Sequence, residues 1–262
     1  MKSDVKQFHK KLIEKYGDLE IWEIDGEKLR SEKDIEFTNF GLWPDFDYIP
    51  KNELWLDVER DPDERRFFID HMLAQWKTLK KTGNNDKAIA KAYKIEAAER
   101  AKAGDKAKIF DKAKHAHPEK VHLKKLAETT AGLVVWLING RLVRSAFFID
   151  FVDGGHHLIY PWVPEKEVWL DDDLDPAEYP YVLLHELHER MLMAKGWDYN
   201  HAHPDSSRIE LYCHHHPHHL PEELAKLGWV SSSRTRCVIP DPIGSGMTNT
   251  HFRGNDILFE LQ

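Results

Sequence analysis

Glu53-Leu54-Trp55-Leu56-Asp57 returns 114 positions later as Glu167-Val168-Trp169-Leu170-Asp171, and this repeat decides the fold. The same offset relates further pairs: Trp22 and Trp136, Pro50 and Pro164, Asp61-Pro62 and Asp175-Pro176, Glu64 and Glu178, His71 and His185. Solenoid arrays have periods of about 20–50 residues, so a period this long indicates a duplicated domain. The sequence therefore predicts two related lobes, packed with pseudo-twofold symmetry in a monomer.

The second copy predicts a lobe in which strands precede helices. Leu133 to Ile138 is a β-rich apolar run, and the Asn139-Gly140 that follows is typical of a two-residue hairpin turn. Asp175-Pro176-Ala177-Glu178 combines a capping residue, a first-turn proline and an acidic residue, which indicates a helix start. The expected elements are a strand within Arg141 to Val152, strands at His157 to Trp162 and Glu167 to Asp171, a helix from about Ala177 to Lys195 ended by Gly196, and a second helix from about Asn200 or Asp205 to Cys213. The predicted fold class is α+β, with each lobe a small antiparallel sheet followed by helices.

The first copy repeats this plan, with Asp25-Gly26 as the hairpin turn, a strand at Asn52 to Val58 and a helix from Glu64 to Lys80. Farther along, an unbroken offset pairs Ile95-Glu96 with Ile209-Glu210. We prefer this pairing, since it needs no gap, to the echo between His115-Ala116-His117-Pro118 and His201-Ala202-His203-Pro204. The predicted domains are residues 1–120, a first lobe with a Lys-rich helical extension; residues 121–213, a second lobe with the candidate site; and residues 214–262, an irregular tail containing Pro, Gly and Ser.

Composition indicates an ordered globular protein, with 41% hydrophobic residues, nine Trp and twelve Phe among 262 residues. The chain has no run of 18 apolar residues, and its first residues lack the apolar core of a signal peptide. We therefore expect neither membrane insertion nor export, and a cytoplasmic location. The two cysteines, Cys213 and Cys237, could pair, but a single pair fits a reducing compartment equally well.

Charge is unevenly spread along the chain. The net charge is −8, yet residues 77–125 contain 15 Lys and Arg against 6 Asp and Glu. This Lys-rich segment could contact nucleic acid or an acidic partner. Its Ala/Lys/Glu composition and its few aromatic residues favour a solvated helical arm instead, so nucleic-acid binding is not the preferred interpretation.

The two copies diverge at a point where the second acquires ligand-type side chains. Its His185-Glu186-Leu187-His188-Glu189 stands opposite His71-Met72-Leu73-Ala74-Gln75 in the first. On a helix His185 and Glu189 share one face, with Glu186 beside them. The next helix carries His203 and Glu210 seven residues apart, again on one face, and either could add a third or fourth ligand. Zinc commonly takes three imidazole or carboxylate ligands from the protein and one water.

The helix of the second copy resembles that of the zincin metallopeptidases, in which His-Glu-x-x-His on a helix follows a sheet. The resemblance covers about 80 residues, and the chain departs from the family's pattern at the fifth motif position, where Glu189 replaces His. It implies zinc ligands at His185 and Glu189, a third ligand from His203 or Glu210, and Glu186 as the base that deprotonates water. We therefore expect a metal-dependent hydrolase, possibly with peptides or another small hydrolysable molecule as substrate.

Several alternatives remain open at this point. His188 could replace Glu189 as the ligand, since positions i and i+3 also share a helix face. The cluster could instead be buried His/Glu packing without a metal, as the flanking Tyr181 to Leu184 and Met191 to Met193 indicate a buried helix. The run Cys213 to His219 could bind transition metals or be an exposed loop. In the last alternative the protein is no enzyme, and the duplicated lobes form a scaffold or an interaction module for nucleic acid or protein.

Overall fold

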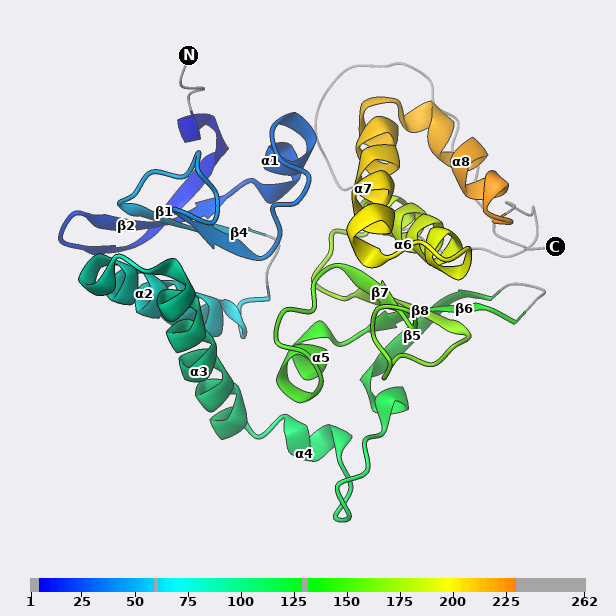
Figure 1. Cartoon of the computed structure of the whole chain (residues 1–262), viewed down its shortest axis with the longest axis horizontal. Coiled ribbons are helices and arrows are strands. Elements are labelled where there is room, and N and C mark those ends of the chain that lie inside the picture. Colours follow the sequence, from blue (N-terminus) through cyan, green and yellow to red (C-terminus); the bar gives the residue numbers. More distant parts are fainter. Residues whose placement is uncertain (1–4, 59–60, 129–131, 230–262) are drawn as a thin grey trace. The chain divides into compact units, whose positions relative to one another are not determined.

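The computed structural model describes residues 5–58, 61–128 and 132–229, and the chain divides into two compact units (Figure 1). Unit 1 is Met1–Val121 together with Gly140–Val152, and unit 2 is His122–Asn139 together with Asp153–Gln262. The α+β class and the duplicated layout are confirmed, since each unit has a four-stranded sheet followed by helices. No helix in the described ranges is long and apolar enough to cross a membrane.

The two sheets have the same topology, with strand orders β1-β2-β4-β3 and β5-β6-β8-β7. The strands of unit 1 are β1 (His9–Tyr16), β2 (Leu19–Ile24), β3 (Phe40–Leu42) and β4 (Glu53–Asp57). Those of unit 2 are β5 (His122–Glu128), β6 (Val134–Ile138), β7 (Gly154–His156) and β8 (Glu167–Asp171). The outer pairs are antiparallel, but the central pairs are parallel, with Trp22 opposite Trp55 and Trp136 opposite Trp169. The sheets are therefore mixed rather than purely antiparallel.

The parallel pairs arise because the two predicted hairpin turns begin helices. Helix α1 (Gly26–Glu32) starts at Asp25, whose side chain accepts a hydrogen bond from the Lys28 backbone at 3.1 Å. In the second copy Gly140 opens α5 (Gly140–Ala146). A Cβ at position 26 would lie 1.9 Å from Oδ2 of Asp57, so this glycine permits close packing and has no positive φ. An Asx-Gly pair caps a helix as readily as it turns a hairpin, and the hairpin prediction was wrong.

The predicted strand at His157 to Trp162 was also wrong. The chain turns directly after β7, because the backbone N–H groups of Ile159 and Tyr160 both bond to the carbonyl of His156. Pro161 then adds a residue without an N–H group, which suits a turn rather than a strand.

The long helices lie close to the predicted positions. Unit 1 has α2 (Arg65–Thr82), α3 (Asn85–Ala103) and α4 (Lys106–Ile109) besides α1 and α5, with 3-10 turns η1 (Val5–Phe8) and η2 (Pro118–Val121). Unit 2 has α6 (Tyr179–Ala194), α7 (Tyr199–His215), η3 (Pro217–His219) and α8 (Leu220–Lys226). Gly196, with φ of 95°, follows α6 as predicted. The Lys-rich segment is mainly helical, since it contains the end of α2 and the whole of α3 and α4, but α3 packs against α2 and buries Ala88, Ala92, Glu96 and Arg100 instead of being solvated all round.

The part of the segment after His214 that the structure describes, up to Trp229, is mainly helical. The sequence predicted an irregular tail from this point, but α7 continues to His215, and η3 and α8 follow. Leu220, Leu224 and Trp229 are buried and join the core that α6 forms with the sheet of unit 2. The neighbouring histidines and prolines favoured the prediction of an irregular segment, although the spacing of these apolar residues suits a buried helix. Residues 230–262, including Cys237, lie outside the described ranges.

Candidate metal centre

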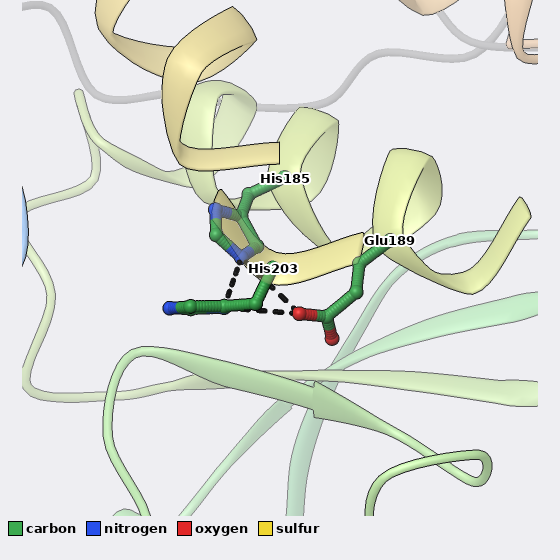
Figure 2. A group of neighbouring side chains, drawn as sticks. All are labelled: His185, Glu189 and His203. Atoms are coloured by element: carbon green, nitrogen blue, oxygen red, sulfur yellow. Dashed lines mark hydrogen bonds and ion pairs between the residues drawn. The ribbon is translucent and has the colours of Figure 1, made fainter. Parts of the chain in front are cut away.

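Two neighbouring helices of unit 2 bring three ligand-type side chains together. His185 and Glu189 stand one turn apart on α6, and His203 comes from the first half of α7 (Figure 2). Asp198 begins α7 by accepting a hydrogen bond from the His201 backbone at 3.1 Å. The ring of Tyr199 stacks on His203 at 4.9 Å between centroids, which helps to orient that imidazole. The fold thus positions the three groups with local interactions.

The three facing atoms form a compact triangle. His185 Nε2 lies 3.1 Å from His203 Nδ1, His203 Nδ1 lies 3.0 Å from Glu189 Oε2, and His185 Nε2 lies 3.7 Å from Glu189 Oε2. A tetrahedral zinc ion with bonds of about 2.0–2.1 Å holds its ligand atoms roughly 3.3 Å apart. The donor set and its spacing therefore fit zinc without rearrangement of the backbone.

The other nitrogen of His185 is held by Glu210 of α7. Its Nδ1–H group donates to Glu210 Oε2 at 2.8 Å, so that Nε2 is the atom directed into the triangle. Histidines that bind metals usually donate their second N–H group in this way. Burial lowers the pKa of His185, but the hydrogen bonds with Glu189 and Glu210 outweigh burial and hold the pKa well above its ordinary value.

His214 extends this arrangement by one layer. Its Nε2 atom lies 3.4 Å from Glu178 and 3.8 Å from Glu210. Burial alone would raise the pKa of Glu210, but hydrogen bonds from His185 and His214 lower that pKa to about 2. Glu210 is therefore an ionised acceptor at neutral pH, and it supports a ligand rather than standing in the triangle itself.

Glu189 has a second contact that the sequence did not reveal. Its Oε1 atom lies 3.2 Å from Nε2 of His156, a fully buried side chain at the end of β7. Nδ1 of His156 accepts a hydrogen bond from the backbone N–H of Leu158 at 3.2 Å, so the proton of the neutral ring is on Nε2. Nε2 of His156 thus lies within ion-pair distance of Oε1 of Glu189, although the angle of a hydrogen bond is not met, and Oε2 of Glu189 faces the two histidines.

His156, Glu186 and Glu189 also gather within 4.8 Å and could be considered a second metal group. The tautomer of His156 argues against that interpretation. A metal bound to Nε2 of His156 would move the proton of the ring to Nδ1, where it would face the backbone N–H group of Leu158, from which Nδ1 now accepts a hydrogen bond. We therefore assign His156 a positioning contact to Glu189.

Glu186 lies beside the triangle with an uncompensated carboxylate. It is 7% exposed, and its Oε2 atom has no hydrogen-bond partner in the described part of the chain. Burial, followed by the charge of Glu189, raises the pKa of Glu186 to about 8. A Cβ at Gly154 of β7 would lie 2.9 Å from Glu186 Oε1, so glycine is what allows this strand to approach the carboxylate. A buried carboxylate of this kind suits proton transfer.

The five residues predicted for the site are all near it, in different roles. His185, Glu189 and His203 form the triangle, Glu186 lies next to it, and Glu210 bonds to His185 from outside. Of the two candidate ligands His188 and Glu189, it is Glu189 that lies in the triangle. His188 turns to α7, where its Nδ1 lies 3.4 Å from the Ser206 hydroxyl and its Nε2 lies 3.8 Å from Asp205.

The first copy retains the outer support but not the triangle. His71 Nδ1 bonds to Glu96 at 2.7 Å, as His185 does to Glu210, which confirms the unbroken offset of the two sequences. Arg100 is the counterpart of His214 and bonds to Glu64 and Glu96. These two glutamates are the counterparts of Glu178 and Glu210, which lie close to His214. The residues equivalent to the inner groups differ, however. Leu42, Met72, Gln75 and Ile89 occupy the positions of His156, Glu186, Glu189 and His203.

The alignment of the two copies also points to His156. Leu42 on β3 is a buried residue, and the offset of 114 places a histidine at its counterpart on β7. A leucine replaced by histidine in only one copy is the same kind of divergence as Met72 against Glu186. A systematic comparison of the two copies would have found this residue from the sequence.

Comparisons with protein-family models, with curated proteins and with solved structures found no match for this chain.

Proposed function

We propose that unit 2 is a zinc-dependent hydrolase that resembles the zincin metallopeptidases, with His185, Glu189 and His203 as zinc ligands. The observation that carries the proposal is the triangle of His185 Nε2, Glu189 Oε2 and His203 Nδ1, with separations of 3.0–3.7 Å. Two further contacts support the ligands: the hydrogen bond with Glu210 directs Nε2 of His185 inward, and Nε2 of His156 lies 3.2 Å from Oε1 of Glu189, the oxygen that faces away from the two histidines.

When bound, zinc lowers the pKa of a coordinated water to about 7 and polarises the carbonyl group of the substrate. Glu186 is the group of the chain that moves the proton. Its carboxylate would accept a proton from the attacking water and return it to the leaving amine. One O–H bond and the amide C–N bond would break, while a C–O bond to the carbonyl carbon and an N–H bond would form. With a pKa of about 8, Glu186 holds its proton at neutral pH in the metal-free protein, and the positive charge of a bound zinc ion would lower this pKa and give the carboxylate that acts as the base.

The test of this function is a Glu186→Gln variant assayed beside the unaltered protein. Both are loaded with zinc and offered a panel of quenched fluorescent peptides and activated esters. Glutamine keeps the size of the side chain but cannot accept the proton, so we expect zinc content to be unchanged and hydrolysis to fall roughly 10²–10⁴-fold. Equal rates in the two proteins, or no hydrolysis by the zinc-loaded protein on any member of the panel, would contradict the proposal.

A further inference from the structure

Helix α3 carries a row of exposed lysines on the face opposite its packed side. The row occupies positions i, i+4, i+7 and i+15 of the helix: Lys87, Lys91, Lys94 and Lys102. A helix of 3.6 residues per turn aligns these positions on one face, over about 22 Å. The buried residues of α3 lie on the other face: Ala88, Ala92, Glu96 and Arg100. We call the four exposed residues the lysine row.

The positive charge of the lysine row is not balanced by neighbouring carboxylates. The ammonium groups of Lys87, Lys91 and Lys94 form no ion pair with any residue in the described ranges. The acidic residues of α3 lie away from this face of the helix: Asp86, Glu96 and Glu99. The residues between the lysines on the exposed face are alanines: Ala90, Ala97, Ala98 and Ala101. Small side chains here leave the ammonium groups open to a partner.

An open hollow of about 580 Å³ follows α3 and adds three more lysines and an aromatic ring. It is lined by Lys106, Ala107, Phe110, Asp111, Lys112 and Lys114. The carboxylate of Asp111 accepts hydrogen bonds from the backbone N–H groups of Ala113 and His115 at 2.8 and 2.9 Å, so it is engaged within its own loop. Lys106 follows Lys102 by four residues, at most about 14 Å along the backbone, so one extended ligand can reach both.

The second copy lacks the lysine row. At the offset of 114 the counterparts of Lys87, Lys91 and Lys94 are His201, Asp205 and Arg208. Arg208 donates to Asp205 at 2.6 Å, so the charges on this face of α7 offset one another. The shared fold therefore does not require a basic surface here, and only the copy without the triangle has one.

The chemistry of this surface favours single-stranded nucleic acid. Ammonium groups in a row suit the phosphates of one strand, and the ring of Phe110 among the lysines of the hollow offers a base a face for stacking. Helices that bind membrane surfaces carry large apolar side chains, whereas the exposed face of α3 has alanines. Residues 77–125 hold nine more basic than acidic residues in a chain of net charge −8, so the rest of the chain repels phosphates.

We infer that the lysine row of α3 and the hollow lined by Phe110 bind single-stranded nucleic acid, through its phosphates and one stacked base. This binding surface lies in unit 1, and it is independent of the proposed metal centre and its hydrolytic chemistry.

The test is the fluorescence anisotropy of a labelled oligouridylate, titrated with full-length protein at salt concentrations from 50 to 200 mM. One variant carries Lys87→Gln, Lys91→Gln and Lys94→Gln. The matched control carries Lys11→Gln, Lys166→Gln and Lys195→Gln, which removes the same charge from exposed lysines that form no ion pair in the described ranges. Each phosphate contact of a single strand contributes about 0.7 to the slope of log affinity against log salt. In the lysine-row variant we therefore expect the slope to fall by about 2 and the affinity at 50 mM salt to fall about tenfold or more, with both kept in the control.

A Phe110→Leu variant separates stacking from charge. Leucine keeps an apolar side chain near Phe147, whose ring lies 6.2 Å from that of Phe110, but it offers no aromatic face. We expect the affinity to fall several-fold, by about fivefold or more, while the salt slope stays unchanged.

Three results would overturn the inference: no binding of the oligonucleotide at 50 mM salt, equal losses in the lysine-row variant and the control, or an unaltered affinity in Phe110→Leu. Oligoglutamate of equal length serves as competitor. Displacement of the oligonucleotide by oligoglutamate at equal concentration would also overturn it, since the surface would then accept an acidic polypeptide as readily as a nucleic acid. Circular dichroism confirms that each variant is folded.

Discussion

His185 stands between two carboxylates, and this position determines how it responds to protons. Its Nδ1 faces Glu210 at 2.8 Å, and its Nε2 faces Glu189 at 3.7 Å and His203 at 3.1 Å. Since these carboxylates hold the pKa of His185 well above its ordinary value, both ring nitrogens of His185 stay protonated at neutral pH in the metal-free protein. The proton on Nε2 occupies the atom that zinc would require.

Zinc binding should therefore compete with protons around neutral pH. A group with a raised pKa stays protonated until the pH rises through that pKa, so zinc affinity should rise with pH, by about tenfold per unit where one proton is released. The affinity is measured by competition with a chelator between pH 6 and 8. Proton release is counted by calorimetry in buffers of different ionisation enthalpy. An affinity independent of pH across this range would contradict the assignment of His185 as a ligand.

At the scale of single elements, α7 supplies both a ligand, His203, and the support for another, Glu210. Its counterpart α3 keeps only the support, through Glu96 and His71. Glu210 and Glu96 thus make the same kind of contact to a histidine, but only the histidine bound by Glu210 belongs to the triangle. This gives a matched pair of variants within one molecule.

Glu210→Gln should weaken zinc binding about 10–100-fold, because an amide holds the imidazole less firmly and makes it less basic. Glu96→Gln alters the same kind of buried contact in unit 1 and should leave zinc affinity unchanged. Zinc dissociation constants of both variants are compared with that of the unaltered protein, and circular dichroism confirms folding. Equal effects of the two substitutions would show that Glu210 acts only through packing.

The sequence predicted the long elements and most of the site, and missed what depends on tertiary contacts. Strands β4, β6 and β8 and helices α2 and α6 follow from apolar runs and capping residues that are local in sequence. The parallel pairing of β2 with β4 cannot be predicted from such local features, because Asp25-Gly26 suits both a hairpin turn and a helix start. The close approach of Asp57 to Gly26, a tertiary contact, decides between the two. In the same way helical spacing found His185 and Glu189, but His156 comes from a strand far from both in sequence.

At the scale of the whole molecule, duplication separates what the fold requires from what the site adds. Both copies keep the Trp and Glu residues of β4 and β8 and the His–Glu pair between their long helices. Four inner positions differ, at Leu42, Met72, Gln75 and Ile89 in the first copy. The first copy therefore shows that this fold packs well without ligand-type residues there.

Restoring the residues of the first copy in the second should remove the metal and preserve the fold. The variant carries His156→Leu, Glu186→Met, Glu189→Gln and His203→Ile. It should bind no zinc at the triangle, and its metal-free form should be about 1–4 kcal/mol more stable to urea than the unaltered metal-free protein, since buried ionisable groups are replaced by apolar packing. A variant that unfolds would show that the cluster is structural His/Glu packing.

The most direct test of the central claim is the metal content of untagged protein, measured by mass spectrometry beside a variant with His185→Ala and His203→Ala. The histidines from His214 to His219 stay intact in both proteins, so that any metal they bind is common to the two samples. The account predicts that the variant contains about one equivalent of zinc less than the unaltered protein. Equal zinc in both proteins, or none in either, would contradict it.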